Sequence, residues 1–397
     1  MKTVARAALI AVPFVSMLTA CGGGGDGGSG SNSGTTGNGT LQVSMTDAPS
    51  CGFDDVFVTV NKVRVNTSSS AGDNDAGWTD ITMASPQKID LLTLTNGVLA
   101  DLGRAPLPAG QYQQIRLVLA ANQGNTPANS VVVTGTTTEQ PLDTPSATQS
   151  GFKIIQPFTV QPNTLVDLVL DFNACKSIVQ RGNGTFSLKP VVTAIPMVVS
   201  GSITGNVATA QAGAQVFAEQ NGQVVRGTVA DGNGQFVLSP LVQSSTNGTY
   251  DVVIVDNQVP TGHATGIIRS VPVTATQTTT ISTAGAPFTL PTSATSTAAG
   301  TTTPAAQASL RALQTIGSAS YEITSTNANL DTGAYSLALP AAAPLVGTYG
   351  TPLPITLQSI TAVAGKYSIQ ATSAAGVTQN TAVNVSSGNQ SGIDFNF

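Results

Sequence analysis

The chain has 397 residues with a formal net charge of −5, and only 9% of its residues are charged. An acidic chain without a basic cluster lacks the positive surface that nucleic acids and anionic lipid headgroups require, so its composition excludes a nucleic-acid partner. Its polar residues are mainly Thr, Ser, Asn, Gln and Gly, which is typical of exported β-rich proteins.

The first twenty residues have the pattern of a secretory signal. Lys2 and Arg6 precede an apolar run of about a dozen residues, which is too short to cross a bilayer as a permanent helix. Cys21 follows the small residue at which such signals are cut. We therefore expect a signal peptide at residues 1–20.

The segment Leu18-Thr19-Ala20-Cys21 resembles the lipobox of bacterial lipoproteins, in which the cysteine is acylated. The resemblance implies lipidation of Cys21, for example with palmitate, and stable anchoring, because several acyl chains bind a membrane far better than one. Gly22 stands where inner-membrane lipoproteins carry an aspartate, so the resemblance implies the outer membrane, with the protein facing the periplasm or the cell surface. A plain secretory signal followed by an unrelated cysteine is the alternative.

Residues 21–40 are almost all Gly, Ser, Asn and Thr, which predicts a disordered tether with a reach of about 25 Å. The spacing Gly23-x-Gly25-x-x-Gly28 matches a dinucleotide fingerprint only formally, since no strand precedes it and no helix follows. We expect no cofactor.

From residue 41, alternating β-branched and aliphatic residues predict half-buried strands. In one predicted strand the valines change from even to odd positions: Val56, Val58 and Val60 are followed by Val63 and Val65. This change of face predicts a bulge near Asn61-Lys62. A later strand places Asp167 and Asp171 on the face opposite its apolar side chains. The segment from Ile89 to Leu94 predicts a short helical turn.

Five segments of this region occur together in one order: Leu41-x-Val43-Ser44-x-Thr46-Asp47-Ala48-Pro49, Ile89-Asp90-Leu91-Leu92-x-Leu94-x-Asn96-Gly97, Leu107-Pro108-Ala109-Gly110-x-Tyr112, Leu170-Asp171-Phe172 and Leu188-Lys189-Pro190-Val191. They resemble the uncharacterised bacterial lipoprotein domain catalogued as domain of unknown function 4382, over residues 41–199. That family usually has an aspartate where Asn173 stands here. The resemblance implies a lipid-anchored envelope protein and brings no known reaction or ligand.

Residues 200–283 and 308–397 repeat one strand pattern, and the Thr/Ser/Ala/Pro-rich stretch 284–307 between them predicts a linker. Ala214-x-Val216-x-Ala218-x-Gln220 recurs as Ala308-x-Leu310-x-Ala312-x-Gln314. The first unit resembles the carboxypeptidase-regulatory-like or transthyretin-like β-sandwich modules of secreted bacterial proteins, and the second is a more diverged relative. We therefore expect an all-β protein with three immunoglobulin-like or transthyretin-like β-sandwich domains in series after the tether.

Cys51 and Cys175 remain once Cys21 is acylated. Two thiols in an exported chain predict a disulfide, because the envelope outside the inner membrane is oxidising. Two unpaired thiols are the alternative.

Candidate ligand residues are few. Asp73-Asn74-Asp75 offers oxygen ligands for calcium but lacks the full spacing of a calcium loop, and an ordinary solvated hairpin loop explains it as well. Trp78 and Tyr112 are candidates for a platform on which a sugar or peptide would stack, the alternative being that Trp78 anchors the core.

No grouping of residues predicts catalysis. His263 is the only histidine, so it cannot form a two-histidine metal site, and Glu139, Glu219 and Glu322 lie far apart in the sequence. We expect a non-catalytic, lipid-anchored structural or interaction protein of the cell envelope, whose partner is an unknown envelope protein or glycan. A carbohydrate- or peptide-binding surface lipoprotein in adhesion or uptake is the alternative.

Overall fold

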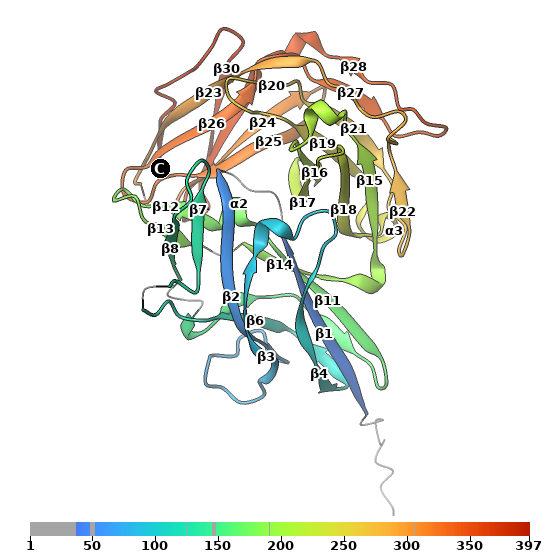
Figure 1. Ribbon diagram of the computed structural model, residues 1–397, viewed down its shortest axis with the longest axis vertical. Helices are drawn as coiled ribbons and strands as arrows, with labels where there is room; N and C mark the ends of the chain where they lie inside the picture. The colour runs from blue at the N-terminus through green and yellow to red at the C-terminus, as the bar shows by residue number, and fades with distance from the viewer. Residues whose placement is uncertain (1–36, 48–51, 125, 145–147, 190, 306) are drawn as a thin grey trace, which may run out of the picture. The chain divides into compact units, whose positions relative to one another are not determined.

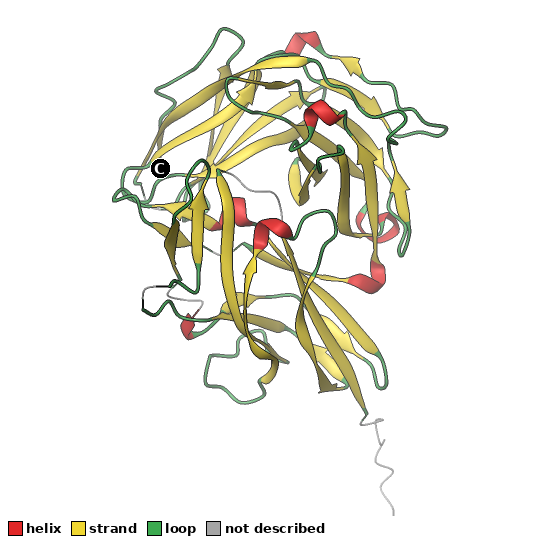
Figure 2. Cartoon of the chain, in the orientation of Figure 1, coloured by secondary structure: helices red, strands yellow, loops and turns green. Residues whose placement is uncertain are grey.

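The computed structural model describes residues 37–397, apart from residues 48–51, 125, 145–147, 190 and 306. The predicted signal peptide, Cys21 and most of the tether lie outside the described residues. Residues 38–40 were expected to end the tether, but they open the first strand, because Thr40 already pairs with Leu165. Strands dominate the described residues, and the helices among them are single short turns (Figure 2). The predicted all-β sandwich fold is confirmed.

The first part of the fold consists of two main sheets that share one hydrophobic core. One sheet has the order β14-β11-β1-β4, with β14 (Val192–Pro196), β11 (Leu165–Phe172), β1 (Asn38–Asp47) and β4 (Ala100–Pro108). The other has the order β12-β13-β8-β7-β2-β6-β9, with β3 paired to β2. Its strands are β12 (Ile178–Gln180), β13 (Phe186–Leu188), β8 (Glu139–Asp143), β7 (Ser130–Val133), β2 (Phe53–Asn66), β6 (Gln114–Leu119), β9 (Phe152–Ile154) and β3 (Thr79–Asp90). A separate pair joins β5 (Gly110–Tyr112) to β10 (Phe158–Val160).

Two local predictions for this part are confirmed. The pairings of β2 with β3 and with β6 both shift register between Val60 and Lys62, which is the predicted bulge, and it keeps the valines on both sides of it buried. The predicted helical turn is the 3₁₀ helix η1 (Leu91–Thr93), and the Asp90 side chain caps it by accepting from Leu92 N.

The rest of the chain repeats one strand arrangement twice. In the first unit β16 lies between β17 and β19, and β15 pairs with β18; in the second, β24 lies between β25 and β29, and β23 pairs with β26. The first set is β15 (Ser200–Asn206), β16 (Gln215–Gln220), β17 (Gln223–Val229), β18 (Gln235–Val242), β19 (Tyr250–Val255), β20 (Thr261–His263), β21 (Gly266–Val271) and β22 (Thr278–Thr280). The second set is β23 (Thr292–Thr303), β24 (Ser309–Ile316), β25 (Ala319–Asn327), β26 (Ala334–Pro340), β27 (Leu345–Thr348), β28 (Gln358–Ser359), β29 (Lys366–Thr372), β30 (Thr378–Asn384) and β31 (Phe395–Asn396).

Short helical turns connect strands in both parts of the fold. They are α2 (Ala174–Ser177), α3 (Ser244–Asn247), η2 (Met197–Val199), η3 (Thr209–Gln211) and η4 (Thr361–Val363).

The prediction of a linker at residues 284–307 is wrong over half of its length. Residues 292–303 form the twelve-residue strand β23, which pairs with β26 and with β20. The composition suggested a flexible segment, but threonine is β-branched and suits a strand, and small Ala and Ser side chains pack closely between neighbours. Ala298 in the middle of β23 is fully buried.

The two repeated units share sheets. Strand β21 of the first unit pairs in parallel with β27 of the second, which produces a sheet with the order β17-β16-β19-β21-β27-β28 (Figure 1). In return, β20 of the first unit pairs with β23 of the second. Backbone hydrogen bonds therefore join the two units in two separate sheets.

Candidate functional site

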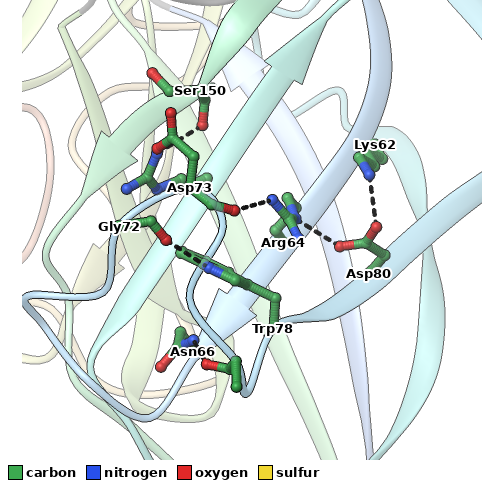
Figure 3. Close-up of polar contacts among 10 residues, drawn as sticks. Lys62, Arg64, Asn66, Gly72, Asp73, Trp78, Asp80 and Ser150 are labelled. Carbon is green, nitrogen blue, oxygen red and sulfur yellow. Dashed lines mark hydrogen bonds and ion pairs between the residues drawn. The ribbon is translucent and has the colours of Figure 1, made fainter.

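Three neighbouring strands bring charged side chains into one row. Asp80 on β3 lies opposite Arg64 on β2, and Arg64 lies opposite Arg116 on β6. Two like charges directly opposite each other destabilise a sheet unless other groups neutralise them. The Asp80 carboxylate does so in part, since it accepts from Arg64 Nε at 2.7 Å and from Lys62 Nζ at 2.6 Å (Figure 3).

Trp78, directly before β3, covers both arginines. Its ring centre lies 4.9 Å from the guanidinium carbon of Arg64 and 5.0 Å from that of Arg116. Its Nε1 donates to the carbonyl oxygen of Gly72 at 2.9 Å (Figure 3). An aromatic face attracts cations, so the ring stabilises the pair of positive charges and holds the loop of residues 67–78 at the same time.

Arg116 fastens this loop to the sheet. Its side chain is only 6% exposed and forms an ion pair with the Asp73 carboxylate. Its Nη1 also donates to the carbonyl oxygen of Ser150 and its Nη2 to that of Ala71, both at 2.9 Å. The guanidinium therefore joins two segments of chain, the loop of residues 67–78 and the segment at Ser150, through charge-assisted contacts, which are the stronger class of hydrogen bond.

The calcium candidate takes part in this network. The Asp73 carboxylate binds Arg116, whereas Asp75 Oδ2 accepts from the backbone N–H of Gly72 at 2.8 Å. Calcium would therefore have to compete with the Arg116 guanidinium for the Asp73 carboxylate. Within the described ranges, no group of three or more His, Cys, Asp or Glu side chains is placed to hold a metal.

The structure places Tyr112, one of the two candidates for a stacking platform, in the core. Tyr112 is 4% exposed and stacks on Phe158 inside the core, with ring centres 5.2 Å apart, and its hydroxyl donates to the carbonyl oxygen of Pro108. The alternation around Tyr112 gave no sign of this, because an aromatic residue suits a core and a binding surface equally. Trp78 alone of the pair is partly exposed, with its ring against two arginines.

A second ionic cluster was not predicted. Asp171 on β11 pairs with Arg226 on β17, and their side chains are 10% and 1% exposed. Burial raises the pKa of Asp171 to about 6, although the Arg226 charge opposes this, and burial also lowers the pKa of Arg226. Asp47 on the neighbouring β1 adds a second negative charge near Arg226. The only sign in the sequence was an aspartate on the reverse face of an apolar strand.

Two of the three glutamates meet despite their distance in sequence. Glu219 accepts from the backbone N–H of Glu322 at 3.0 Å, and Glu322, 2% exposed, binds Lys176 Nζ at 2.7 Å and Arg311 Nη1 at 3.3 Å. Burial raises the pKa of Glu219 well above its usual range, and the Glu322 charge adds to the rise. Glu139 lies elsewhere, paired with Lys88.

His263 and Cys175 occupy structural positions. His263 ends the short strand β20, and its Nδ1 lies 2.6 Å from Asp256 Oδ2. Cys175 lies in α2, where Asn173 fills the N-cap position and accepts from Lys176 N at 2.9 Å. Cys51 lies outside the described residues, so its pairing with Cys175 stays a prediction.

Comparison with known proteins matches one part of the chain. Residues 38–190 match the family model described as Domain of unknown function (DUF4382). This match covers less than half of the chain, supports the resemblance seen in the sequence and names no reaction or ligand. No curated protein matches the chain. The helices in the described part of the chain are too short or too polar to span a bilayer.

Proposed function

We propose that this protein is a non-catalytic, lipid-anchored structural or interaction protein of the cell envelope. The observation that carries the proposal is how its buried ionisable groups are used. Arg116 holds a loop, Arg226 pairs with Asp171, and Glu322 pairs with two cations. A general acid or base must instead be free to exchange a proton with a substrate. Turnover of any substrate by the purified protein, abolished by one point substitution, would overturn the proposal.

We place the anchor at Cys21 and the protein at the outer membrane, facing the periplasm or the cell surface. The lipobox pattern supports this, and so does the start of β1 at Asn38, which leaves residues 22–37 as a polar link between Cys21 and the first strand.

The experiment that tests the anchor is Cys21→Ser in cells supplied with labelled palmitate. We expect the natural chain to take up the label and to sediment with outer membranes, and the variant to lose both properties. Cys175→Ser is the matched control and should keep the label. A natural chain without label would contradict the proposal. If the chain is labelled, protease treatment of intact cells shows which side of the outer membrane the protein faces.

Two structural assignments complete the proposal. We assign both repeated units to the carboxypeptidase-regulatory-like or transthyretin-like class, supported by their equivalent strand orders. We also assign a disulfide between Cys51 and Cys175, supported by Gly52, the neighbour of Cys51, which lines the same pocket of about 470 Å³ as Cys175.

A further inference from the structure

The second repeated unit has a sheet with one apolar and one polar face. This sheet has the order β25-β24-β29-β30. Leu310 and Ile369 point into the core from one face. The other face carries two rows of paired polar residues, which are Ser325, Arg311, Gln370 and Asn380 in the first row and Asn327, Ser309, Thr372 and Thr378 in the second. Such a face offers hydroxyl and amide groups at the regular spacing of neighbouring strands.

Part of this polar face is the floor of a pocket of about 410 Å³. Its walls include Lys176 from α2 and Lys189 and Val191 from the segment after β13, all from the first part of the chain. A volume of this size is within the range of small-molecule sites. The pocket therefore combines a hydroxyl-rich floor with basic walls.

The charges lining this pocket do not balance. Its described lining residues include three cations, Lys176, Lys189 and Arg311, and one carboxylate, Glu322. Glu322 binds both Lys176 and Arg311. Lys189 belongs to no ion pair within the described residues, and its Nζ makes one long hydrogen bond, 3.4 Å, to the carbonyl oxygen of Gln307.

Lys189 is also partly withdrawn from water. Burial lowers the pKa of Lys189, which means that its charged form is short of solvation in this pocket. An anion beside it would restore that stabilisation. By contrast, the adjoining pocket of about 470 Å³ has no charged side chain among its described lining residues. Of these two pockets, only the one that contains Lys189 has an excess of positive charge.

We propose that this pocket binds a small polyhydroxylated anion, namely a sugar acid. The carboxylate of the ligand lies beside Lys189 and Arg311, and its hydroxyl groups face Ser309, Gln370 and Thr372 on the floor. Arg311 is already positioned for this, because Gln370 Oε1 accepts from its Nε at 2.6 Å. This inference goes beyond the proposed function, because it does not depend on lipidation at Cys21.

The test is calorimetric titration of the full-length chain in detergent with galacturonate and its dimer. Galactose is the neutral control and inorganic phosphate the control for charge alone. We expect saturable binding of the sugar acids that weakens with added salt, and no binding of galactose. Binding of galactose as tight as that of galacturonate would overturn the role of the charge. Phosphate binding as tight as that of galacturonate would overturn the assignment of a sugar.

Two variants locate the binding. Lys189→Gln removes one charge-assisted contact and should weaken galacturonate binding by about tenfold or more. Thr378→Glu places a negative charge at the open edge of the floor and should abolish it. Lys153→Gln, on an exposed position of β9, is the matched control and should bind like the natural chain. With melting temperatures unchanged, normal binding by both pocket variants would overturn the site.

Discussion

Asp171 on β11 and Arg226 on β17 form an ion pair that is almost closed to solvent, although 55 residues separate them in the sequence. Strand β11 belongs to the first part of the fold and β17 to the first repeated unit. The two parts thus meet through a buried pair of opposite charges. A pair of this kind is costly to bury, and it is costlier to break by removing one partner.

We expect Arg226→Met to lower the free energy of unfolding by about 3–5 kcal/mol near pH 8, because Asp171 is left buried and unpaired. The loss should be smaller near pH 5, where Asp171, whose pKa burial raises to about 6, takes up a proton. Urea unfolding at the two pH values measures both effects. Adding Asp171→Leu should recover most of the stability, and an equal loss at both pH values would contradict this account.

Glu219 should make the fold less stable as pH rises. Its pKa is raised well above the usual 4.5, so the folded protein holds this proton more tightly than the unfolded chain does. Stability is then lost as pH rises through the raised pKa. We expect Glu219→Gln, measured by thermal unfolding, to be more stable than the natural chain at alkaline pH and to differ little under acidic conditions.

Glu139→Gln is the matched control for this effect. The hydrogen bond from Lys88 Nζ lowers the pKa of Glu139, so its ionised form stabilises the fold and the sign is reversed. The variant should gain no stability at alkaline pH. A gain as large as that of the Glu219 variant would show that the effect comes from net charge and not from burial.

Trp78 should stabilise the loop of residues 67–78 in two separable ways. Trp78→Phe keeps an aromatic face for the arginines but loses the bond to the Gly72 carbonyl, so we expect a loss of about 1 kcal/mol. Trp78→Ala also loses the ring, and a loss of about 2–4 kcal/mol is expected. Urea unfolding measures both, and limited proteolysis should cut the loop faster in the alanine variant. Equal cutting of the two variants would argue against a role for the ring.

Reduction should weaken the fold through Cys51 and Cys175. A cross-link across a loop of this length stabilises by up to about 4–5 kcal/mol in the loop-entropy account. We expect mass spectrometry of freshly purified protein to find no free thiol besides any at Cys21, and reduction to lower the melting temperature. The double variant Cys51→Ser, Cys175→Ser should melt like the reduced protein and be insensitive to reductant. Two titratable thiols in the native protein would rule out the bond.

Local pattern predicted much of the fold. The bulge after Val60 followed from a change of parity, and the two repeated units followed from a recurring alternation. Strand β23 was missed because its small polar residues resemble a linker when only composition is considered. Its pairing with β26, which lies far along the chain, decides its structure.

The site residues were harder to predict for the same reason. The sequence placed Asp171 on the reverse face of its strand, but nothing local pointed to Arg226 as its partner. Trp78 was a reasonable candidate, yet the two arginines that it covers come from strands that become neighbours only after folding. The burial of Tyr112 could not be predicted, because it depends on which residues pack above the strand, and a single sequence does not specify them.

The parallel pairing of β21 with β27 also affects the order in which the chain can fold. Strand β21 ends at Val271, and its neighbour β27 begins only at Leu345. The first repeated unit is therefore synthesised with an uncovered sheet edge, which remains open until about half of the second unit has followed. An open edge can pair with another chain. Successful folding thus depends on β27 reaching the edge of β21 before a neighbouring molecule does.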